Sequence, residues 1–387
     1  MNQKTYNFDE IVDRENVEST KYGLYRDPPQ ILPFWVADMD FEPPREVTKA
    51  IVERAALPNY GYTFASDACF DHFIAWNQRR NHFEIERSAI LSVGGIMCSL
   101  GHVLEALTQK HERILSFSPV YDVFHAVVRE HQRDLVLSPM INTHQRYEID
   151  WQDFETKIRS GVKLFLLCNP LNPSGLVWRR NDLERIAALC LENDVLVFSD
   201  DVYSDIIYPG HHYTPIASLS QEIKKQTITG MSPGKSFCIS GLSTAFLIIP
   251  DDGLRRKVGG VMQAYHMFGN LFGFKAAETA YACGEQWLCE AAQYLSGTAD
   301  LVQSFCNTNI PKLKVHMPEA AFLMWLDFSE FDLPQDKLMD RLYTQAHIRA
   351  NDGTMYGEAG RGFIRFNIGT SRSRVQDGLE RIAAAFP

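Results

Sequence analysis

Short apolar runs alternate with helical patterns through the middle of the chain. Seven runs are rich in Leu, Ile, Val and Phe, at 89–93, 113–117, 135–137, 163–168, 195–199, 227–229 and 244–249. Between several of them, apolar positions recur every three or four residues, as in 96–107 and in 182–192, where Asn181 is the expected N-cap. This alternation predicts an α/β fold in which a mostly parallel seven-stranded sheet lies between helices.

The rest of the chain predicts two further parts. The first 50 residues carry several prolines around one apolar cluster, which is typical of an extended arm. Near the other end, strand patterns at 315–317, 322–327 and 362–368 alternate with helical patterns at 335–346 and 373–385. We therefore expect a large domain over 51–285, a smaller α/β domain over 286–387, and an N-terminal arm over 1–50 that packs on the small domain.

Composition limits the kinds of molecule that the protein is expected to bind and the cellular compartment in which it is expected. The 387 residues are 45% hydrophobic and 22% charged, which is typical of a globular protein. The net charge of −10 and the lack of a basic run argue against nucleic acid as a partner. The first residues form no apolar signal region and no apolar stretch approaches the roughly 18 residues of a membrane span, so we expect a cytoplasmic protein without membrane contact. Eight cysteines without a CxxC pair, and no HExxH, predict reduced thiols and no metal site.

Lys235 lies in the segment TITGMSPGKSFCISGLSTAFLII, at 227–249, whose pattern predicts a strand, a turn and a strand. A phosphate-binding P-loop would need a glycine where Thr229 stands and a long helix after the lysine, so its pattern fails. A lysine at the mouth of a sheet is also suited to a Schiff base with pyridoxal phosphate (PLP). A surface lysine in a turn is the third interpretation, and the choice depends on the rest of the chain.

Other candidate residues follow the expected strands, at the edge where open α/β sheets bind ligands. Gly95 and Ile96 begin a helix whose free backbone N–H groups suit a phosphate, and Tyr121 follows the next strand. Asn172 lies in the segment NPLNPSG, and Asp200 follows a strand directly. A buried carboxylate there needs a cationic partner such as a pyridinium N–H. Each feature also has a purely structural interpretation, namely a turn, core packing or a helix cap.

Taken together, the order Gly-Gly, Tyr, NPxG, DxxY, SxxK and a late Arg resembles the fold-type I PLP enzymes of the aminotransferase class I/II superfamily, over nearly the whole chain. The resemblance implies that Lys235 is the Schiff-base lysine, that Asp200 binds the pyridine nitrogen and that Tyr121 stacks on the ring. It further implies that the cofactor phosphate is bound by Gly95, Ile96 and Ser232. The 3-oxygen of the cofactor would be bound by Asn172 and Tyr203, and the substrate by Arg365 and Ala37. It also implies a homodimer, in which Tyr62 reaches the phosphate of the neighbouring subunit.

Two stretches, WVADMDF at 35–41 and LVW at 176–178, resemble the MalY/PatB-type cystathionine β-lyases, also called cysteine-S-conjugate β-lyases. Ser243 agrees with that branch, because many aminotransferases carry a phosphate-binding arginine eight residues after the lysine. Tyr203 and Leu171 depart from it, since these lyases usually carry histidine at both positions. Tyr203 is the residue that resembles an aminotransferase.

The resemblance implies β-elimination from cystathionine, cysteine or cysteine S-conjugates, which gives a thiol, pyruvate and ammonia. PLP would be the electron sink, and Lys235 the general base at the substrate Cα. Transamination by a class I/II aminotransferase would use the same residues and is an alternative. A non-catalytic PLP-binding regulatory protein is the alternative from another class, and the presence of both Asp200 and Lys235 argues for an enzyme.

Overall fold

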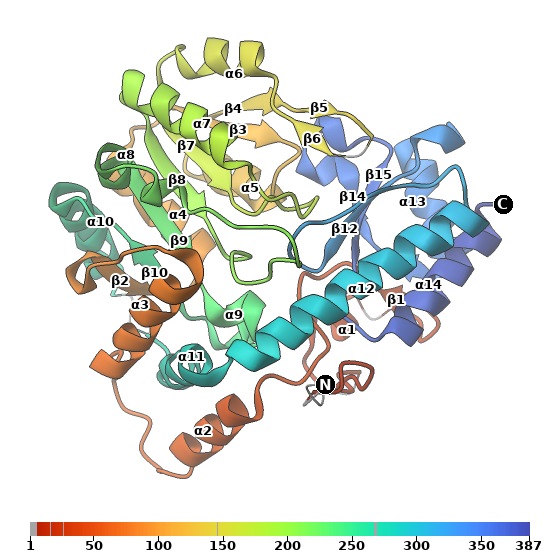
Figure 1. Cartoon of the computed structure of the whole chain (residues 1–387), viewed down its shortest axis with the longest axis horizontal. Helices are drawn as coiled ribbons and strands as arrows, with labels where there is room; N and C mark the ends of the chain where they lie inside the picture. The colour runs from red at the N-terminus through yellow and green to blue at the C-terminus, as the bar shows by residue number, and fades with distance from the viewer. Residues whose placement is uncertain (1–5, 16, 26, 145, 267–268) are drawn as a thin grey trace.

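Seven strands form the central sheet of the larger part of the molecule (Figure 1). The computed structural model describes residues 6–15, 17–25, 27–144, 146–266 and 269–387. In spatial order the strands are β2 (Ile90–Val93), β10 (Ala245–Ile248), β9 (Thr227–Met231), β8 (Leu196–Asp200), β7 (Val162–Cys168), β3 (Arg113–Ser118) and β4 (Asp134–Pro139). Neighbouring strands are parallel except at β10, which is antiparallel to β2 and β9. The predicted seven-stranded, mostly parallel sheet is confirmed, with strand limits shifted by one or two residues.

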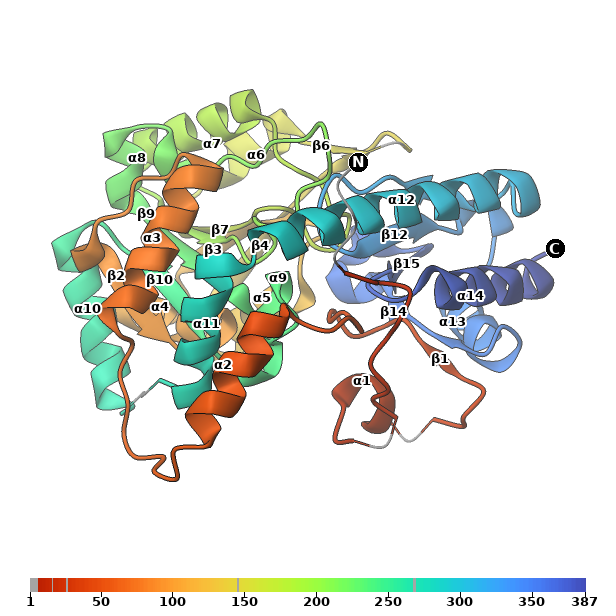
Figure 2. The same ribbon diagram turned by 60° about the horizontal axis from the view of Figure 1, so that its bottom comes forward.

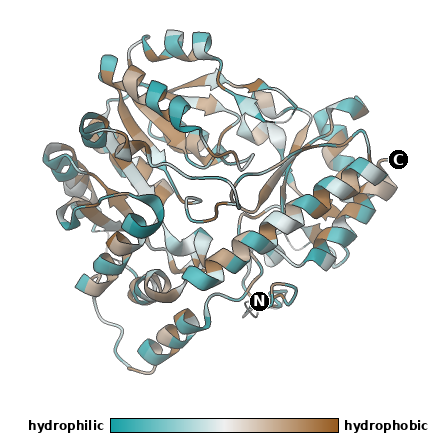
Figure 3. Cartoon of the chain, viewed as in Figure 1, coloured by the Kyte–Doolittle hydropathy of each residue, from teal (hydrophilic) through white to brown (hydrophobic). Residues whose placement is uncertain are grey.

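Helices cover both faces of this sheet (Figure 2). On one face α4 contacts both α5 and α10, and on the other α7 contacts both α6 and α8, while α11 contacts α2 and α3 in a group beside β2 and β10. Their limits are α2 (Arg45–Ala55), α3 (Asp67–Asn81), α4 (Ile96–Leu107), α5 (Asp122–Glu130), α6 (Trp151–Ile158), α7 (Arg180–Glu192), α8 (Gln221–Gln226), α10 (Asp252–Ala264) and α11 (Leu271–Cys283). Figure 3 shows the apolar strands enclosed between helices whose outer faces are polar, so the sheet carries the core of this part.

The N-cap predicted for α7 is wrong. The helix begins at Arg180, and Arg179 is the N-cap residue, with extended backbone angles and no side-chain capping bond. Both terminal nitrogens of the Arg179 guanidinium donate to Glu148 at 2.9 Å. This ion pair anchors the chain before the helix, and it leaves Asn181 inside the first turn instead of ahead of it.

The smaller part contains a four-stranded antiparallel sheet and three helices (Figure 1). Its strands, in spatial order, are β11 (Lys314–His316), β12 (Leu323–Asp327), β15 (Phe363–Asn367) and β14 (Asn351–Asp352). Its helices are α12 (Glu285–Asn309), α13 (Gln335–Thr344) and α14 (Arg372–Ala385). The strand β15 carries Arg365 at a position that is 4% exposed. The substrate-binding arginine expected from the sequence is therefore held in the middle of a sheet.

The first part of the chain lies against this smaller sheet. The short strand β1 (Leu32–Pro33) pairs in parallel with β13 (Ile348–Arg349), and α1 (Thr20–Gly23) precedes it. The ring of Phe34 stacks on that of Phe366 with 4.1 Å between centroids. The carboxylate of Asp27 pairs with the guanidinium of Arg349. These contacts fit the arrangement expected for an N-terminal arm over 1–50, while the domain limits themselves stay a prediction.

The remaining short elements connect these parts. They are β5 (Ile141–Asn142), β6 (Tyr147–Glu148), α9 (Pro233–Ser236), η1 (Arg87–Ala89), η2 (Ile216–Ser218), η3 (Ser240–Leu242), η4 (Ser329–Phe331), η5 (Gly353–Tyr356) and η6 (Glu358–Gly360), where η denotes a 3₁₀ helix. No helix within the described ranges is both long enough and apolar enough to cross a membrane.

Candidate active site

Lys235 lies on the short helix α9, which follows β9 at the carboxyl edge of the central sheet. The sequence pattern predicted a turn here, and the structure corrects it to one helical turn that Ser232 caps. The Ser232 hydroxyl accepts from the Gly234 N–H at 3.1 Å and donates to the Thr244 carbonyl at 2.8 Å. The 3₁₀ helix η3 and the antiparallel strand β10 come next in the chain, instead of the long helix that a P-loop requires. The P-loop interpretation is therefore wrong.

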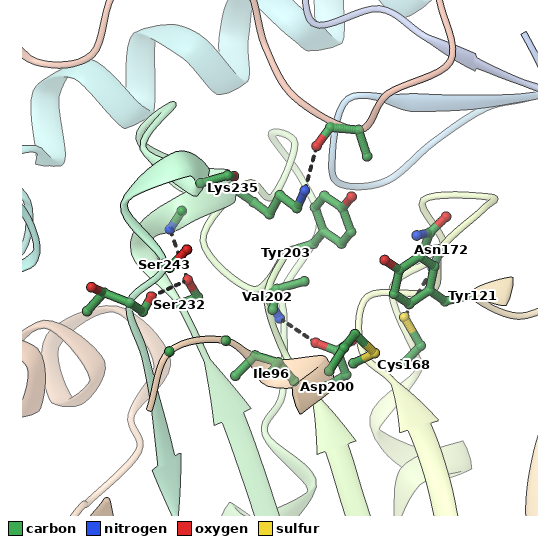
Figure 4. A pocket seen from close by; sticks show the side chains of 17 residues that line it. Ile96, Tyr121, Cys168, Asn172, Asp200, Val202, Tyr203, Ser232, Lys235 and Ser243 are labelled. Atoms are coloured by element: carbon green, nitrogen blue, oxygen red, sulfur yellow. Dashed lines mark hydrogen bonds between the residues drawn. The ribbon is translucent and has the colours of Figure 1, made fainter. Parts of the chain in front are cut away.

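A cavity of about 190 Å³ lies at this edge of the sheet, and Lys235 and Asp200 reach into it from opposite sides (Figure 4). Nine of the eleven candidate site residues line it: Ala37, Gly95, Ile96, Tyr121, Asn172, Asp200, Tyr203, Ser232 and Lys235. They come from the N-terminal arm and from the ends of five strands of the sheet. The sheet topology brings the strand ends to one edge, and the N-terminal arm adds Ala37, which is 198 positions from Lys235 in the chain.

The amine of Lys235 is held in a setting that favours its neutral form. Its Nζ donates to the Ala37 carbonyl at 2.6 Å. Burial, together with the nearby positive charge of Arg365, lowers the pKa of Lys235 to about 8, although Asp38 and Asp200 oppose the shift. A lysine with a pKa close to neutral has a free electron pair in a useful fraction of molecules, as a nucleophile or a general base requires.

Asp200 and Asp201 are adjacent, but only Asp200 faces the cavity. The Asp200 side chain is 2% exposed and accepts from the Val202 N–H at 3.4 Å. Burial raises its pKa to about 7, a sign that the carboxylate lacks sufficient compensation in the protein alone. Asp201 instead accepts from the Ser199 hydroxyl at 2.5 Å and from the Tyr213 hydroxyl. Asp200 is thus the member of the pair that is available to a cationic ligand.

Arg365 does not line the cavity directly, but it lies immediately behind one of its walls. Its Nη1 donates to the side-chain oxygen of Asn172 at 3.1 Å, and its Nη2 donates to the Trp35 carbonyl at 2.8 Å. Its Nε is buried and has no hydrogen-bond partner among the described residues. Asn172 therefore connects the arginine to the cavity.

The turn that presents Asn172 depends on Gly175. Gly175 has a φ of +70°, and a Cβ there would lie 2.6 Å from the side chain of Pro318 and 2.7 Å from the Ala320 carbonyl oxygen. Both the backbone conformation and the close approach of the smaller part of the chain exclude a side chain. The NPxG signal in the sequence thus has a local structural cause in addition to its place beside the cavity.

Tyr62, unlike Arg365, lies on the surface of the chain, away from this cavity. Its side chain is 95% exposed, in the segment between α2 and α3. The structure therefore does not bring Tyr62 to the cavity of its own chain.

Several cavity residues were not singled out as site residues from the sequence. They are Gly94, Met97, Cys168, Val202, Gly234, Ser240, Ser243 and Thr244. Most are next to a predicted site residue, and their side chains have no distinctive chemistry. Ser243 and Thr244 reach the cavity because η3 turns the chain back toward β10, and Ser243 has a φ of +45° there. The position of a turn of this kind is not encoded in strand or helix periodicity.

Residues 29–382 match the model of the family described as aminotransferase class I and II. The chain belongs to the aminotransferase class I and II family. It is 37% identical to cystathionine β-lyase PatB of Bacillus subtilis (strain 168) over 98% of this chain and 99% of that protein. It is 24% identical to protein MalY of Escherichia coli (strain K12) over 97% of both chains. These two relatives belong to the branch that the sequence resembles.

Solved structures of family members agree with the architecture. Cystalysin from Treponema denticola, which contains a pyridoxal 5′-phosphate cofactor, has a TM-score of 0.95 at 26% identity and covers 98% of both chains. The PLP-bound C–S lyase from Staphylococcus hominis has a TM-score of 0.91 at 29% identity and again covers 98% of both chains. This chain is thus a PLP-dependent enzyme of fold type I, and the comparisons support a C–S β-lyase within the aminotransferase class I and II family.

The residues at the cavity fit PLP on chemical grounds. Asp200 offers a buried, undercompensated carboxylate to the pyridine nitrogen, and Lys235 offers a primary amine on the opposite side. The Gly95 N-cap and the first turn of the 12-residue helix α4 supply N–H groups for a phosphate, with the Ser232 hydroxyl nearby. The arrangement has one complementary group for each polar part of the cofactor.

The lowered pKa of Lys235 predicts how the PLP-free protein captures the cofactor. At a pH below the pKa of about 8, most of the amine is protonated and cannot attack the aldehyde. The rate of covalent capture should therefore rise about tenfold per pH unit below pH 8 and level off above it. Stopped-flow absorbance after PLP is mixed with apoprotein measures this rate, with free lysine as the reference reaction. A plateau reached only above pH 10 would show that burial does not activate this amine.

Proposed function

We propose that this enzyme cleaves the Cβ–S bond of L-cystathionine or other cysteine S-conjugates and releases a thiol, pyruvate and ammonia. One observation carries the proposal: a single buried cavity joins the Lys235 amine to the Asp200 carboxylate in a chain that is 37% identical to a cystathionine β-lyase. Cysteine is a smaller substrate of the same class. Its reaction would release hydrogen sulfide.

Each residue around the cavity has a separate role in this reaction. When bound, PLP supplies the electron sink for negative charge that develops at the substrate Cα. Lys235 takes the Cα proton, which its lowered pKa permits near neutral pH. Asp200 keeps the pyridine nitrogen protonated, and Tyr121 covers the ring. Arg365, beside Asn172, binds the substrate carboxylate, and the Ala37 carbonyl lies within reach of the reacting amine.

Product analysis tests which bond is broken. With L-cystathionine we expect homocysteine, pyruvate and ammonia in equal amounts, because elimination divides the substrate into these three products. Mass spectrometry of the reaction mixture identifies them. A 2-oxo acid that retains the intact sulfur-containing skeleton of cystathionine would instead show that the amino group was removed without cleavage of the C–S bond.

Transamination is the second candidate function, and Tyr203 is the observation that favours it. Its ring lines the cavity and packs edge-on against Phe322, with 5.6 Å between centroids. Burial raises the pKa of the Tyr203 phenol, so the hydroxyl stays protonated and can donate to the 3-oxygen of the cofactor. An aminotransferase can use this hydrogen bond as well as a lyase can. The two functions are therefore distinguished by whether the enzyme turns over without added 2-oxo acid.

The functional unit we propose is a homodimer. The segment between α2 and α3 exposes a set of large apolar side chains, with exposures of 60%, 95% and 86% for Tyr60, Tyr62 and Phe64. Monomeric proteins seldom expose apolar side chains in such a group without a partner. A second copy would cover this segment, and Tyr62 would donate its hydroxyl to the phosphate in the neighbouring cavity.

Mixing two defective variants tests this role of Tyr62. Tyr62→Phe should weaken PLP binding by about 10- to 100-fold, the usual effect of losing one hydrogen bond to a charged group. Heterodimers of Tyr62→Phe and Lys235→Ala subunits would contain one site free of both changes. At limiting PLP, the mixture should therefore be more active than the average of the two homodimers. A mixture that only matches this average, or an active monomer in sedimentation, would contradict action across the interface.

A further inference from the structure

A second cavity, of about 370 Å³, adjoins the first beside Lys235. Gly234, Lys235 and Ser240 line both cavities. The other walls of the second cavity come from the N-terminal arm and from the segment after α9: Val12, Arg14, Asp38, Met39, Phe41, Pro43, Cys238 and Gly241. Atoms of a substrate that extend past the reacting lysine have room in this second cavity.

An ion pair lies in the wall of the second cavity. Nη2 of Arg14 donates to Oδ2 of Asp38 at 2.7 Å, and the two side chains are 23% and 20% exposed. The other oxygen, Oδ1 of Asp38, has no hydrogen-bond partner among the described residues, and its contact with Nζ of Lys21 is long, at 3.9 Å. Oδ1 is itself buried, so the pair meets the cavity through the partly exposed surfaces of Arg14 and Asp38, which both line it.

The deeper charges of this cluster have a different role. Nζ of Lys21 and Oδ2 of Asp40 are 2.9 Å apart, and their side chains are only 1% and 0% exposed. The Tyr22 hydroxyl also donates to Asp40, at 2.9 Å. Together with Nη1 of Arg14, which lies 3.5 Å from Oδ1 of Asp40, these groups hold the N-terminal arm in place. A ligand in the cavity is left with Arg14 and Asp38.

We propose that Arg14 and Asp38 form a subsite for a leaving group that itself carries an amino-acid zwitterion. Arg14 would pair with the distal carboxylate, and the Asp38 carboxylate would accept from the distal ammonium. This inference rests on the proposed function, because it requires a substrate bound at Lys235. The substrate class is then cysteine S-conjugates whose leaving thiol is an amino acid, such as L-cystathionine.

The position of Asp38 in the chain supports this assignment. It directly follows Ala37, whose carbonyl accepts from Nζ of Lys235 at 2.6 Å. The Asn367 side chain fixes the loop on both sides of this contact, because its Nδ2 donates to the carbonyls of Val36 and Asp38 at 2.6 and 2.7 Å. The carboxylate is thus held at a set distance from the reacting amine, as recognition of a chain of defined length requires.

A panel of substrates tests the subsite in the unaltered holoenzyme. S-propyl-L-cysteine and L-cystathionine both carry a thiol-linked carbon chain, but only the second has a distal zwitterion. S-(2-aminoethyl)-L-cysteine and S-(2-carboxyethyl)-L-cysteine each carry one of the two charges. We expect kcat/KM for L-cystathionine to exceed that for S-propyl-L-cysteine by on the order of 100-fold or more, with intermediate values for the singly charged compounds.

Arg14→Gln then assigns the carboxylate contact. We expect the ratio of kcat/KM for L-cystathionine to kcat/KM for S-propyl-L-cysteine to fall about 10-fold or more, mainly because KM for L-cystathionine rises. The ratio of kcat/KM for S-(2-aminoethyl)-L-cysteine to kcat/KM for S-propyl-L-cysteine should change little. Arg14→Lys should restore part of the loss. Lys337→Gln, on the exposed surface of α13, is the matched control for removal of one positive charge.

The possible failures can be distinguished. If the holoenzyme cleaves S-propyl-L-cysteine and L-cystathionine with equal kcat/KM, or if Arg14→Gln leaves their ratio unchanged, the subsite is refuted although the lyase stands. If no member of the panel releases a thiol, the proposed function fails first, and the subsite fails with it.

Discussion

Replacement of Lys235 by alanine is expected to abolish covalent retention of PLP and to lower turnover of L-cystathionine by about 10²- to 10⁴-fold, the usual contribution of a positioned general base. The cavity contains this one amine among its described lining residues, and the opposite wall carries Asp200. Borohydride reduction followed by peptide mapping measures the attachment directly. The wild-type protein should carry the label on Lys235.

Lys235→Arg is the matched control for this experiment. Arginine keeps the positive charge and fills the space, but its guanidinium stays protonated and is not a nucleophile at neutral pH. It should therefore lose the covalent label as completely as the alanine variant does. A reducible label on another lysine in both variants, with turnover retained, would show that Lys235 is not the reacting residue.

Replacement of Asp200 by alanine is expected to cost about 3 to 5 kcal/mol in cofactor binding or turnover, or two to three or more decades. The reason is that the pyridine nitrogen loses its buried anionic partner and no longer stays protonated. Asp200 is suited to this partnership because it lines the cavity and Asp201 does not, although burial raises the pKa of both carboxyl groups to about 7. Steady-state kinetics at saturating PLP, together with a PLP titration, separate the two contributions.

Asp201→Ala is the neighbouring control. Its carboxylate holds the hydroxyls of Ser199 and Tyr213 in the core, so its loss should lower the free energy of unfolding by about 1 to 3 kcal/mol for each abandoned partner. The effect on turnover should be much smaller than that of Asp200→Ala. Equal and small effects of the two substitutions on turnover would contradict the assignment of Asp200.

The sequence was informative where local pattern and burial coincide. The strand runs predicted the sheet because several strands are buried on both faces and continuously apolar, as in β10. The cap of α7 could not be predicted from Asn181, because the N-cap residue is Arg179, which makes no side-chain capping bond and pairs instead with the distant Glu148. Long-range contacts of this kind leave no local signal.

The same distinction applies to the cavity. Lys235, Asp200 and Asn172 could be named from the sequence because they follow strands whose carboxyl ends meet in a parallel sheet. Arg14 carried no comparable signal. It reaches the second cavity only because the N-terminal arm lies across the molecule and brings it to Asp38, 24 positions along the chain.

The most direct test of β-elimination is the number of 2-oxo acid molecules that each protomer forms from L-cystathionine when no 2-oxo acid is supplied. Elimination regenerates the PLP form in every cycle, so we predict many molecules of pyruvate per protomer at a constant rate, with no acceleration by added 2-oxoglutarate. An aminotransferase would stop after one 2-oxo acid per protomer with its cofactor in the pyridoxamine form, and would resume only when a 2-oxo acid is added. That result would contradict the lyase and make Tyr203 the decisive residue of the cavity.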